Sequence, residues 1–158
     1  MRVVGIDPGM SGGVALLTST GQAMVDDLPF VGKRLDAGEL LRMLKAWGPI
    51  DKVIVEDVSA RPGNGSVSSF NFGCGFGAVC AVVSCAGIPL VLSRPAIWKR
   101  AMNLNQDKER SRQRAIQLFP TTSGLSRRKD EGRAEALLLA AHLLRTENVS
   151  FTTSSLSA

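Results

Sequence analysis

The N-terminal stretch of this chain constrains its fold more than any other segment. Two short runs rich in β-branched and apolar residues, RVVGID at 2–7 and GGVALLT at 12–18, are joined by the turn sequence PGMS. Proline, glycine and serine favour a tight turn, so the two runs are predicted to form an antiparallel hairpin. The first strand ends in a carboxylate, Asp7, within an otherwise apolar run. The fold has to explain what this acid does beside a core strand.

The next three elements follow from the spacing of apolar residues. Residues 21–29 supply a third predicted strand. The segment 36–48 repeats apolar residues at the i, i+3, i+4 and i+7 positions of an amphipathic helix and begins at a good capping residue, Asp36. Residues 51–57, DKVIVED, form a β-branched run that is typical of a buried parallel strand and carries Glu56 near its end. Acids therefore lie at the ends of two separate predicted strands.

The rest of the chain alternates loops, helices and one further strand. In order, we expect a Gly/Ser-rich loop at 59–77, a buried helix of small residues at 78–87, a strand at 88–93, a helix that begins at Pro95, a basic helix within 107–120 and a final helix that begins near 130. Phe70 and Phe72 are expected to pack beneath the helix that follows their loop, with stacking on nucleic-acid bases as the alternative. This order predicts an α/β domain over residues 1–150, with a flexible tail at 151–158.

The composition fits one domain with a polyanionic partner. A chain of 158 residues, 44% of them hydrophobic, is long enough for a single core. The chain has 19 Lys and Arg against 14 Asp and Glu, which gives a formal net charge of +5. An excess of this kind favours a partner such as nucleic acid without establishing one.

The cysteines and the N-terminal sequence indicate the cellular compartment in which the protein is expected. Cys74, Cys80 and Cys85 are odd in number, close together and without CxxC spacing, which favours reduced core thiols over a disulfide framework or a zinc site. We find no long apolar run for a membrane span and no cleavable signal. We therefore expect a cytoplasmic protein without membrane contact, in a bacterial or phage-infected cell, with an organelle as the alternative.

The acidic side chains are predicted to form one cluster. Parallel neighbouring strands bring Asp7 and Glu56 side by side, and two like charges that close repel unless a cation neutralises them. On the last helix, Glu131 and Glu135 are four residues apart and share a face. Asp130 lies about 140° round from Glu135 on an ideal helix, and it is also suited to cap that helix. The residues alone leave both Asp130 and Glu131 as candidates.

Such oxygen ligands favour Mg²⁺ or Mn²⁺. Four carboxylates around two ions about 4 Å apart would bracket a phosphodiester, with one ion preparing the attacking water and the other stabilising the leaving 3′ oxygen. The predicted chemistry is therefore metal-dependent phosphodiester hydrolysis.

Four ordered motifs carry a resemblance to a known family. They are GIDPGMSGGVA, VIVED, RPAIWK followed by DKERSRQRAIQLFP, and KDEGRAEALLLAAH. In this order they resemble the RuvC-type Holliday-junction resolvases of the RNase H-like (retroviral integrase) superfamily, and most of all the phage-borne and plant chloroplast branch. The resemblance covers nearly the whole chain, from Met1 to about Leu144.

The resemblance implies a fold, an activity and an assembly. It implies an RNase H-like five-stranded mixed sheet, with three antiparallel and then parallel strands, flanked by helices on both faces. It also implies a homodimer, whose contact helix matches the small-residue segment from Gly73 to Gly87. The implied activity is Mg²⁺- or Mn²⁺-dependent cleavage of a four-way DNA junction by paired symmetric nicks.

The resemblance also assigns residues. Asp7, Glu56 and Glu135 match metal-binding acids of the family. In bacterial members the two C-terminal acids are three residues apart, a spacing that falls on Gly132 here, so the fourth ligand shifts to Asp130 or Glu131.

Basic residues are the remaining candidates. Lys99 and Lys108 match basic positions near the scissile phosphate, with Lys99 as a further catalytic group. The other DNA-binding candidates are Arg61, Asn64, Arg112, Arg127, Arg128, Lys129 and Arg133. His142 is expected to pack in the helix rather than act as a base.

Two other functions are compatible with the same residues. One is a nuclease that acts on other branched DNA or on RNA/DNA hybrids. The other is a non-catalytic junction-binding protein, although the presence of Asp7, Glu56 and Glu135 argues against it. An actin-like ATPase is disfavoured because the chain is too short for two lobes that enclose a nucleotide.

Overall fold

One mixed β-sheet organises the molecule. The computed structural model describes residues 1–57, 59, 63 and 65–148, and its five-stranded sheet has the order β3-β2-β1-β6-β7. The strands are β1 (Arg2–Ile6), β2 (Gly13–Thr18), β3 (Ala23–Asp27), β6 (Lys52–Glu56) and β7 (Leu90–Ser93). The first three strands pair antiparallel, whereas β1 with β6 and β6 with β7 pair parallel. The predicted sheet is therefore confirmed.

The register of β1 and β6 brings two acids together. Ile6 pairs with Val55 in the parallel ladder, so the residues that follow, Asp7 and Glu56, emerge at the same edge of the sheet. The backbone N–H of Asp7 also donates to the carbonyl of Gly13 at 3.0 Å, which closes the β1–β2 turn.

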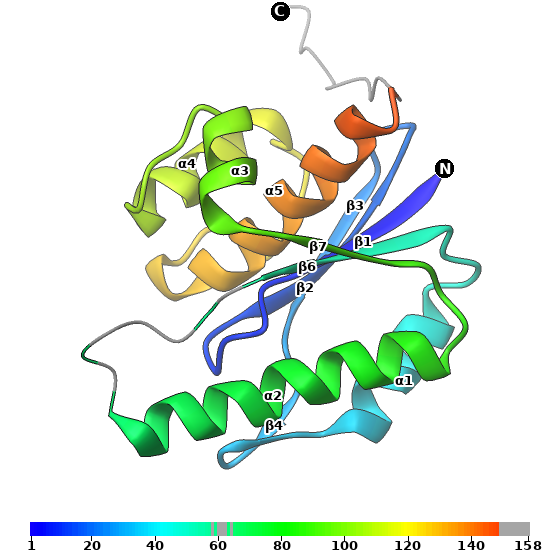
Figure 1. The fold of residues 1–158 in the computed structure, drawn as a ribbon. Coiled ribbons are helices and arrows are strands. Elements are labelled where there is room, and N and C mark those ends of the chain that lie inside the picture. Colours follow the sequence, from blue (N-terminus) through cyan, green and yellow to red (C-terminus); the bar gives the residue numbers. More distant parts are fainter. Residues whose placement is uncertain (58, 60–62, 64, 149–158) are drawn as a thin grey trace, which may run out of the picture.

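Helices cover both faces of the sheet, as predicted (Figure 1). One face carries α1 (Ala37–Ala46) and α2 (Ser66–Cys85). The other carries α3 (Pro95–Ala101), α4 (Lys108–Leu118), a short 3-10 helix η1 (Arg128–Asp130) and α5 (Glu131–Thr146). Because side chains alternate along a strand, Val3 joins the core beneath α5, while Val4 joins the core beneath α1 and α2.

Helix α5 lies unusually close to the sheet. A Cβ atom added at Gly5 would come within 2.0 Å of the Ala136 carbonyl oxygen. At the start of the helix, Gly132 forms an isolated parallel bridge with Gly12 in the β1–β2 turn. These backbone contacts fix α5 against β1 and β2, and with it the position of Glu135.

Helix caps follow the local sequence. Asp36 accepts a hydrogen bond from the Glu39 N–H at the start of α1, which confirms the predicted cap. Pro95 is the first residue of α3, and the Asp107 carboxylate accepts from the N–H groups of Glu109 and Arg110 at the start of α4.

The prediction for residues 59–77 is wrong in its second half. Helix α2 begins at Ser66, so Phe70 and Phe72 lie within it rather than in a loop beneath it. Phe70 is 71% exposed. The glycines of this stretch suggested a loop, yet Gly75 is tolerated because the Phe30 ring packs against it. The chain also forms an unpredicted two-residue hairpin, β4 (Phe30–Val31) with β5 (Arg34–Leu35).

Helix α2 is apolar but largely uncovered, so the prediction of a buried helix at 78–87 is wrong: only Val79, Val82 and Val83 of that range are buried. By length and composition it would also suit a membrane span, which is weak evidence by itself. Cys74 and Cys85 are exposed free thiols on this helix, and Cys80 is a half-buried one, so the prediction that these thiols lie in the core is wrong for Cys74 and Cys85. On α5, His142 is buried, and burial lowers its pKa, in line with the packing role expected for it. The predicted tail at 151–158 lies outside the described residues.

Candidate active site

Three carboxylates from three different elements line one cavity. Asp7 follows β1, Glu56 ends β6, and Glu135 lies on the second turn of α5. All three are buried. The cavity, of about 370 Å³, is also lined by Lys99 and Lys108.

The β1–β2 turn holds Asp7. Its Oδ1 accepts a hydrogen bond from the Gly9 N–H at 3.2 Å. Burial raises the pKa of Asp7, and the nearby Glu135 carboxylate raises it further, against the opposing effect of Lys108. A nearby cation would therefore stabilise the ionised form of the carboxyl group that this turn holds.

Glu56 is oriented by an indole. The fully buried Trp98 of α3 donates from Nε1 to Glu56 Oε1 at 2.9 Å. Burial, together with the charge of Asp7, raises the pKa of Glu56 to about 7. Two acids at one sheet edge therefore disfavour each other's ionised form.

Glu135 is held by three side chains. Its Oε1 accepts from Lys99 Nζ at 2.6 Å and from Ser111 Oγ at 3.2 Å. Its Oε2 lies 3.5 Å from Lys108 Nζ, which is also 3.9 Å from Asp7 Oδ2. The Lys108 ammonium group therefore lies between two of the acids.

The two lysines balance part of the negative charge. Lys99 is buried in its pair with Glu135, whereas the side chain of Lys108 is 46% exposed at the mouth of the cavity. Partial burial by itself lowers the pKa of Lys108, but Asp7 and Glu135 together raise it above its ordinary value. Within the described part of the chain, no three His, Cys, Asp or Glu side chains are already grouped around a metal position.

The predicted fourth carboxylate is not in this cavity. Asp130 is buried elsewhere, where its carboxylate accepts from the backbone N–H of Arg127 at 2.8 Å and from the Arg127 guanidinium. These contacts lower the pKa of Asp130. Neither Asp130 nor Glu131 is among the cavity's lining residues.

The backbone explains why position 132 carries no acid. A Cβ atom at Gly132 would lie 2.2 Å from the Ser11 carbonyl oxygen and 2.7 Å from the Gly12 carbonyl carbon. No side chain fits there without moving the β1–β2 turn. Three of the predicted carboxylates, Asp7, Glu56 and Glu135, therefore line this cavity without a fourth. Which carboxylates bind the two metal ions remains a prediction.

Comparison of the whole structure with solved structures finds chains of similar fold. RuvC of Thermus thermophilus, solved in complex with a Holliday junction substrate, superposes with a TM-score of 0.66 at 20% identity and covers 95% of this chain and 99% of its own. The yeast mitochondrial Holliday junction resolvase Ydc2 gives 0.58 at 13% identity, over 92% of this chain and 80% of its own. The fowlpox virus Holliday junction resolvase gives 0.56 at 12% identity, over 92% and 99%.

The chain has the RuvC fold. This is the RNase H-like fold that the sequence motifs predicted. No protein-family model and no curated protein sequence matches the chain.

Within this RuvC fold, several predicted DNA-binding arginines have partners inside the chain. Arg112 binds Glu109 and the carbonyl oxygen of Leu125, and Arg133 binds both carboxylate oxygens of Asp27. These contacts tie α4 and α5 to neighbouring segments.

Two other basic candidates remain free to meet a ligand. Arg128 and Lys129 are exposed on η1. Arg127 is also exposed, although it pairs with Asp130. Arg61 and Asn64 lie outside the described residues.

Sequence reasoning missed two residues that position the acids in this RuvC fold. Trp98 directly precedes the candidate Lys99, and Ser111 follows Lys108 by three residues on α4. The spacing of Ser111 was a usable signal, because residues three apart share a helix face. The Trp98 contact with Glu56 spans 42 positions and has no local signature.

Proposed function

We propose that this protein is an endonuclease that cuts four-way DNA junctions. The observation that carries the proposal is the convergence of Asp7, Glu56 and Glu135 beside Lys99 and Lys108 at one sheet edge. The RuvC fold supports it, because structures of that fold include a resolvase bound to a Holliday junction substrate. A site with acids and ammonium groups in one cavity suits hydrolysis of an anionic phosphodiester.

The acids fit a divalent metal ion. All three offer carboxylate oxygens, the ligands that Mg²⁺ and Mn²⁺ prefer. Burial raises the pKa of Asp7 and of Glu56, so a bound cation would favour the charged form of both carboxyl groups. Asp7, Glu56 and Glu135 would hold the ion, which when bound would activate a water molecule and stabilise negative charge on the phosphate.

The protein's own side chains prepare this site. Trp98 fixes the orientation of Glu56, while Lys99 and Ser111 fix that of Glu135. Lys108, half-exposed at the mouth of the cavity, is positioned to contact the phosphate that enters. The exposed Arg128 and Lys129 would contact the DNA backbone further away.

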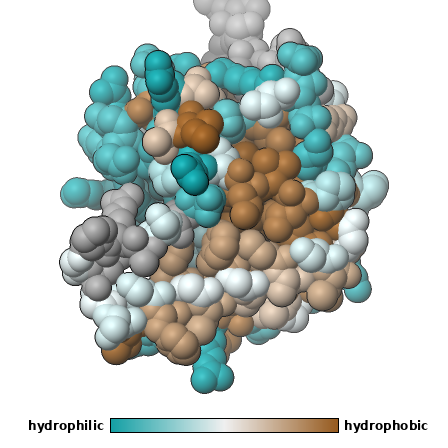
Figure 2. Space-filling model, in the orientation of Figure 1, coloured by the Kyte–Doolittle hydropathy of each residue, from teal (hydrophilic) through white to brown (hydrophobic). Residues whose placement is uncertain are grey.

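We also propose a homodimer, and the uncovered apolar surface supports it. Figure 2 shows hydrophobic surface on the face that carries β7 and α2. Leu92 on the edge strand β7 is 48% exposed, and Ile97 and Phe70 are exposed as well. Exposed apolar surface of this kind marks interaction sites, and an uncovered edge strand invites association. We assign this surface to contact with a second copy, which would supply the second nick. A cytoplasmic location also remains our proposal.

The decisive experiment compares substrates. Labelled four-way junction, matched duplex and RNA/DNA hybrid are incubated with the protein in Mg²⁺ and in chelator. We expect paired cuts in the junction only, and only with metal. Equal cutting of all three substrates, or cutting in chelator, would overturn the proposal; preferential cutting of the hybrid would favour the RNase H-type alternative.

A variant separates catalysis from binding. Asp7→Asn keeps the shape of the side chain and its bond from Gly9, so it should abolish cleavage while junction binding persists. The exposed Asp26→Asn on β3 is the matched control and should cleave normally. Junction binding without cleavage by the unaltered protein would favour the non-catalytic alternative.

A further inference from the structure

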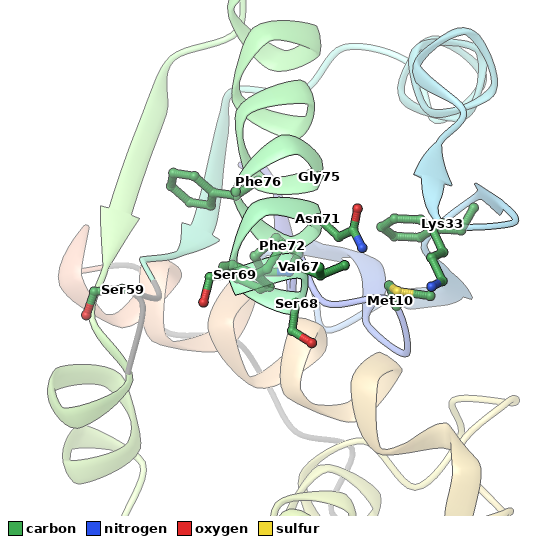
Figure 3. A pocket seen from close by; sticks show the side chains of 13 residues that line it. Met10, Lys33, Ser59, Val67, Ser68, Ser69, Asn71, Phe72, Gly75 and Phe76 are labelled. Carbon is green, nitrogen blue, oxygen red and sulfur yellow. The ribbon is translucent and has the colours of Figure 1, made fainter. Parts of the chain in front are cut away.

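A second cavity lies beside the catalytic one. It has a volume of about 650 Å³ and lies between the first half of α2, the β4–β5 hairpin and the β1–β2 turn. This volume is within the range of about 300–1,000 Å³ that is usual for ligand pockets. Figure 3 shows Asn71 pointing from α2 toward Lys33, with Met10 nearby.

One face of α2 shapes this cavity. Val67, Asn71 and Gly75 are spaced by four residues, so they share a helix face. Gly75 has no side chain, and the Phe30 ring of β4 lies 3.4 Å from the position its Cβ would take. A flat aromatic ring therefore lies directly against the helix, next to an amide.

The polar groups of the cavity are unpaired. The half-buried Asn71 amide has no hydrogen-bond partner among the described residues, and neither has the exposed Lys33 ammonium group. Lys33 is the one charged residue among the described lining residues. Met10 and Val67 expose 55% and 68% of their surface. The cavity thus combines apolar walls, an amide that makes no hydrogen bond to the described residues and a positive charge.

The second cavity adjoins the catalytic one. Phe72 lines both cavities. Pro8, which directly follows the catalytic Asp7, also lines the second cavity. When a DNA strand places its phosphodiester at the carboxylates, a neighbouring nucleotide can therefore reach this cavity.

We propose that this second cavity, the base pocket (Met10, Phe30, Lys33, Val67, Asn71 and Phe72), receives one nucleobase next to the scissile phosphate. This inference rests on the proposed nuclease function. A nucleobase has apolar faces for Phe30 and Phe72 and a hydrogen-bonding edge for Asn71, and its phosphate suits Lys33. The Asn71 amide makes the pocket selective, because a base edge that leaves the amide unpaired is penalised.

The test varies the base beside the cut in a set of four-way junctions. Junctions carry each of the four bases, or an abasic site, at successive positions beside the cut. Cleavage rates are measured in Mg²⁺, and binding is measured in chelator. The variants are Asn71→Leu, which keeps size but loses the amide, and Lys33→Met, with Lys45→Met on α1 as the matched exposed-lysine control.

For the unaltered protein, we expect one position at which the preferred base is cut about tenfold faster than the others and at which an abasic site slows cleavage similarly. Asn71→Leu should reduce this preference to about twofold or less and should make the abasic site harmless. Lys33→Met should weaken binding at every sequence, and Lys45→Met should change neither property.

An unchanged base preference in Asn71→Leu, or indifference to abasic sites at every position, would overturn the base pocket while leaving the nuclease function intact. That pattern would point instead to a peptide partner for the cavity. Absence of junction cleavage in the unaltered protein is a different result, which counts against the proposed function itself.

Discussion

At the scale of single residues, Lys108 acts as a built-in counter-ion. Its ammonium group lies 3.5 Å from Glu135 and 3.9 Å from Asp7, in a place that competes with any metal ion bound by those acids. The same group is half-exposed toward the mouth of the cavity. Lys108 is therefore expected to oppose metal binding while favouring the anionic substrate.

The first prediction tests this double role. In Lys108→Met, the protein alone should bind Mn²⁺ about tenfold more tightly, because a nearby positive charge is removed. Junction binding in chelator should weaken. Mn²⁺ binding is measured by electron paramagnetic resonance of the free ion. Lys45→Met is the control, and an unchanged Mn²⁺ affinity in Lys108→Met would contradict the counter-ion role.

The second prediction concerns the pH dependence of stability. The pKa of Glu56 rises from its ordinary 4.5 to about 7 on folding, so between these values the folded state holds a proton that the unfolded chain releases. Without metal, stability should therefore fall as pH rises from about 4.5 to 7 and then level off. Asp7, whose pKa is also raised, adds to the fall.

The variant Glu56→Gln tests this pH dependence of stability. The amide still accepts the Trp98 hydrogen bond but carries no charge, so the variant should be more stable at pH 8 by about 1–3 kcal/mol. At pH 4 the difference should nearly vanish. Urea unfolding at both pH values measures the difference, and an equal effect at the two pH values would refute the assignment of the titration to Glu56.

At the scale of elements, the bridge between the β1–β2 turn and α5 sets the geometry of the site. Gly12 and Gly132 meet backbone to backbone. The turn carries Asp7, and the helix carries Glu135 one turn further on. The distance between these two acids is thus fixed by main-chain packing.

The third prediction follows from this contact. Gly132→Ala should destabilise the protein by about 2–4 kcal/mol, because the new Cβ would overlap the backbone of Ser11 and Gly12. It should also lower cleavage by displacing Asp7 from Glu135. Gly73→Ala in α2 is the control: nothing lies within 4 Å of its Cβ position, so the change should be neutral or stabilise by up to about 1 kcal/mol. Chemical unfolding compares the two, and similar effects would refute the close-contact argument.

The elements also show how far the sequence predicts the structure. The strand ends at Asp7 and Glu56 were predictable because apolar β-branched runs and a parallel register leave few alternatives. The start of α2 was not, since Gly and Ser between 65 and 77 favour a loop until Phe30 packs against Gly75. The two-residue strands β4 and β5 are too short to show any periodicity.

Candidate ligands were harder to predict than strands. Glu135 came from the family resemblance, and the structure brings it to the other two acids. Asp130 and Glu131 were inseparable by spacing, because the choice depends on the Arg127 contact and on the space at Gly132. Side-chain contacts between segments that are far apart in the sequence leave no local pattern in that sequence.

At the scale of the whole molecule, the exposed apolar face of α2 and β7 is the surface that we propose for the dimer contact. The fourth prediction is that Ala81→Arg, at an exposed position of α2, converts a dimer into a monomer. A charged side chain in an apolar contact must be desolvated without a partner. Ala46→Arg, at an exposed position near the end of α1, is the matched control and should remain dimeric. Sedimentation measures mass; an unaltered protein that is monomeric would refute the dimer.

Helix α5 runs from the cavity that the three acids line to the opposite end of the sheet, where Lys52 at the start of β6 pairs with Glu147 just beyond the helix. Strand β1 begins at that same end, so Met1 and Glu147 both lie away from the carboxylates (Figure 1). A molecule tethered to a surface through Met1, or through a cysteine introduced near Glu147, would therefore present its carboxylate edge outward, which suits single-molecule observation of junctions.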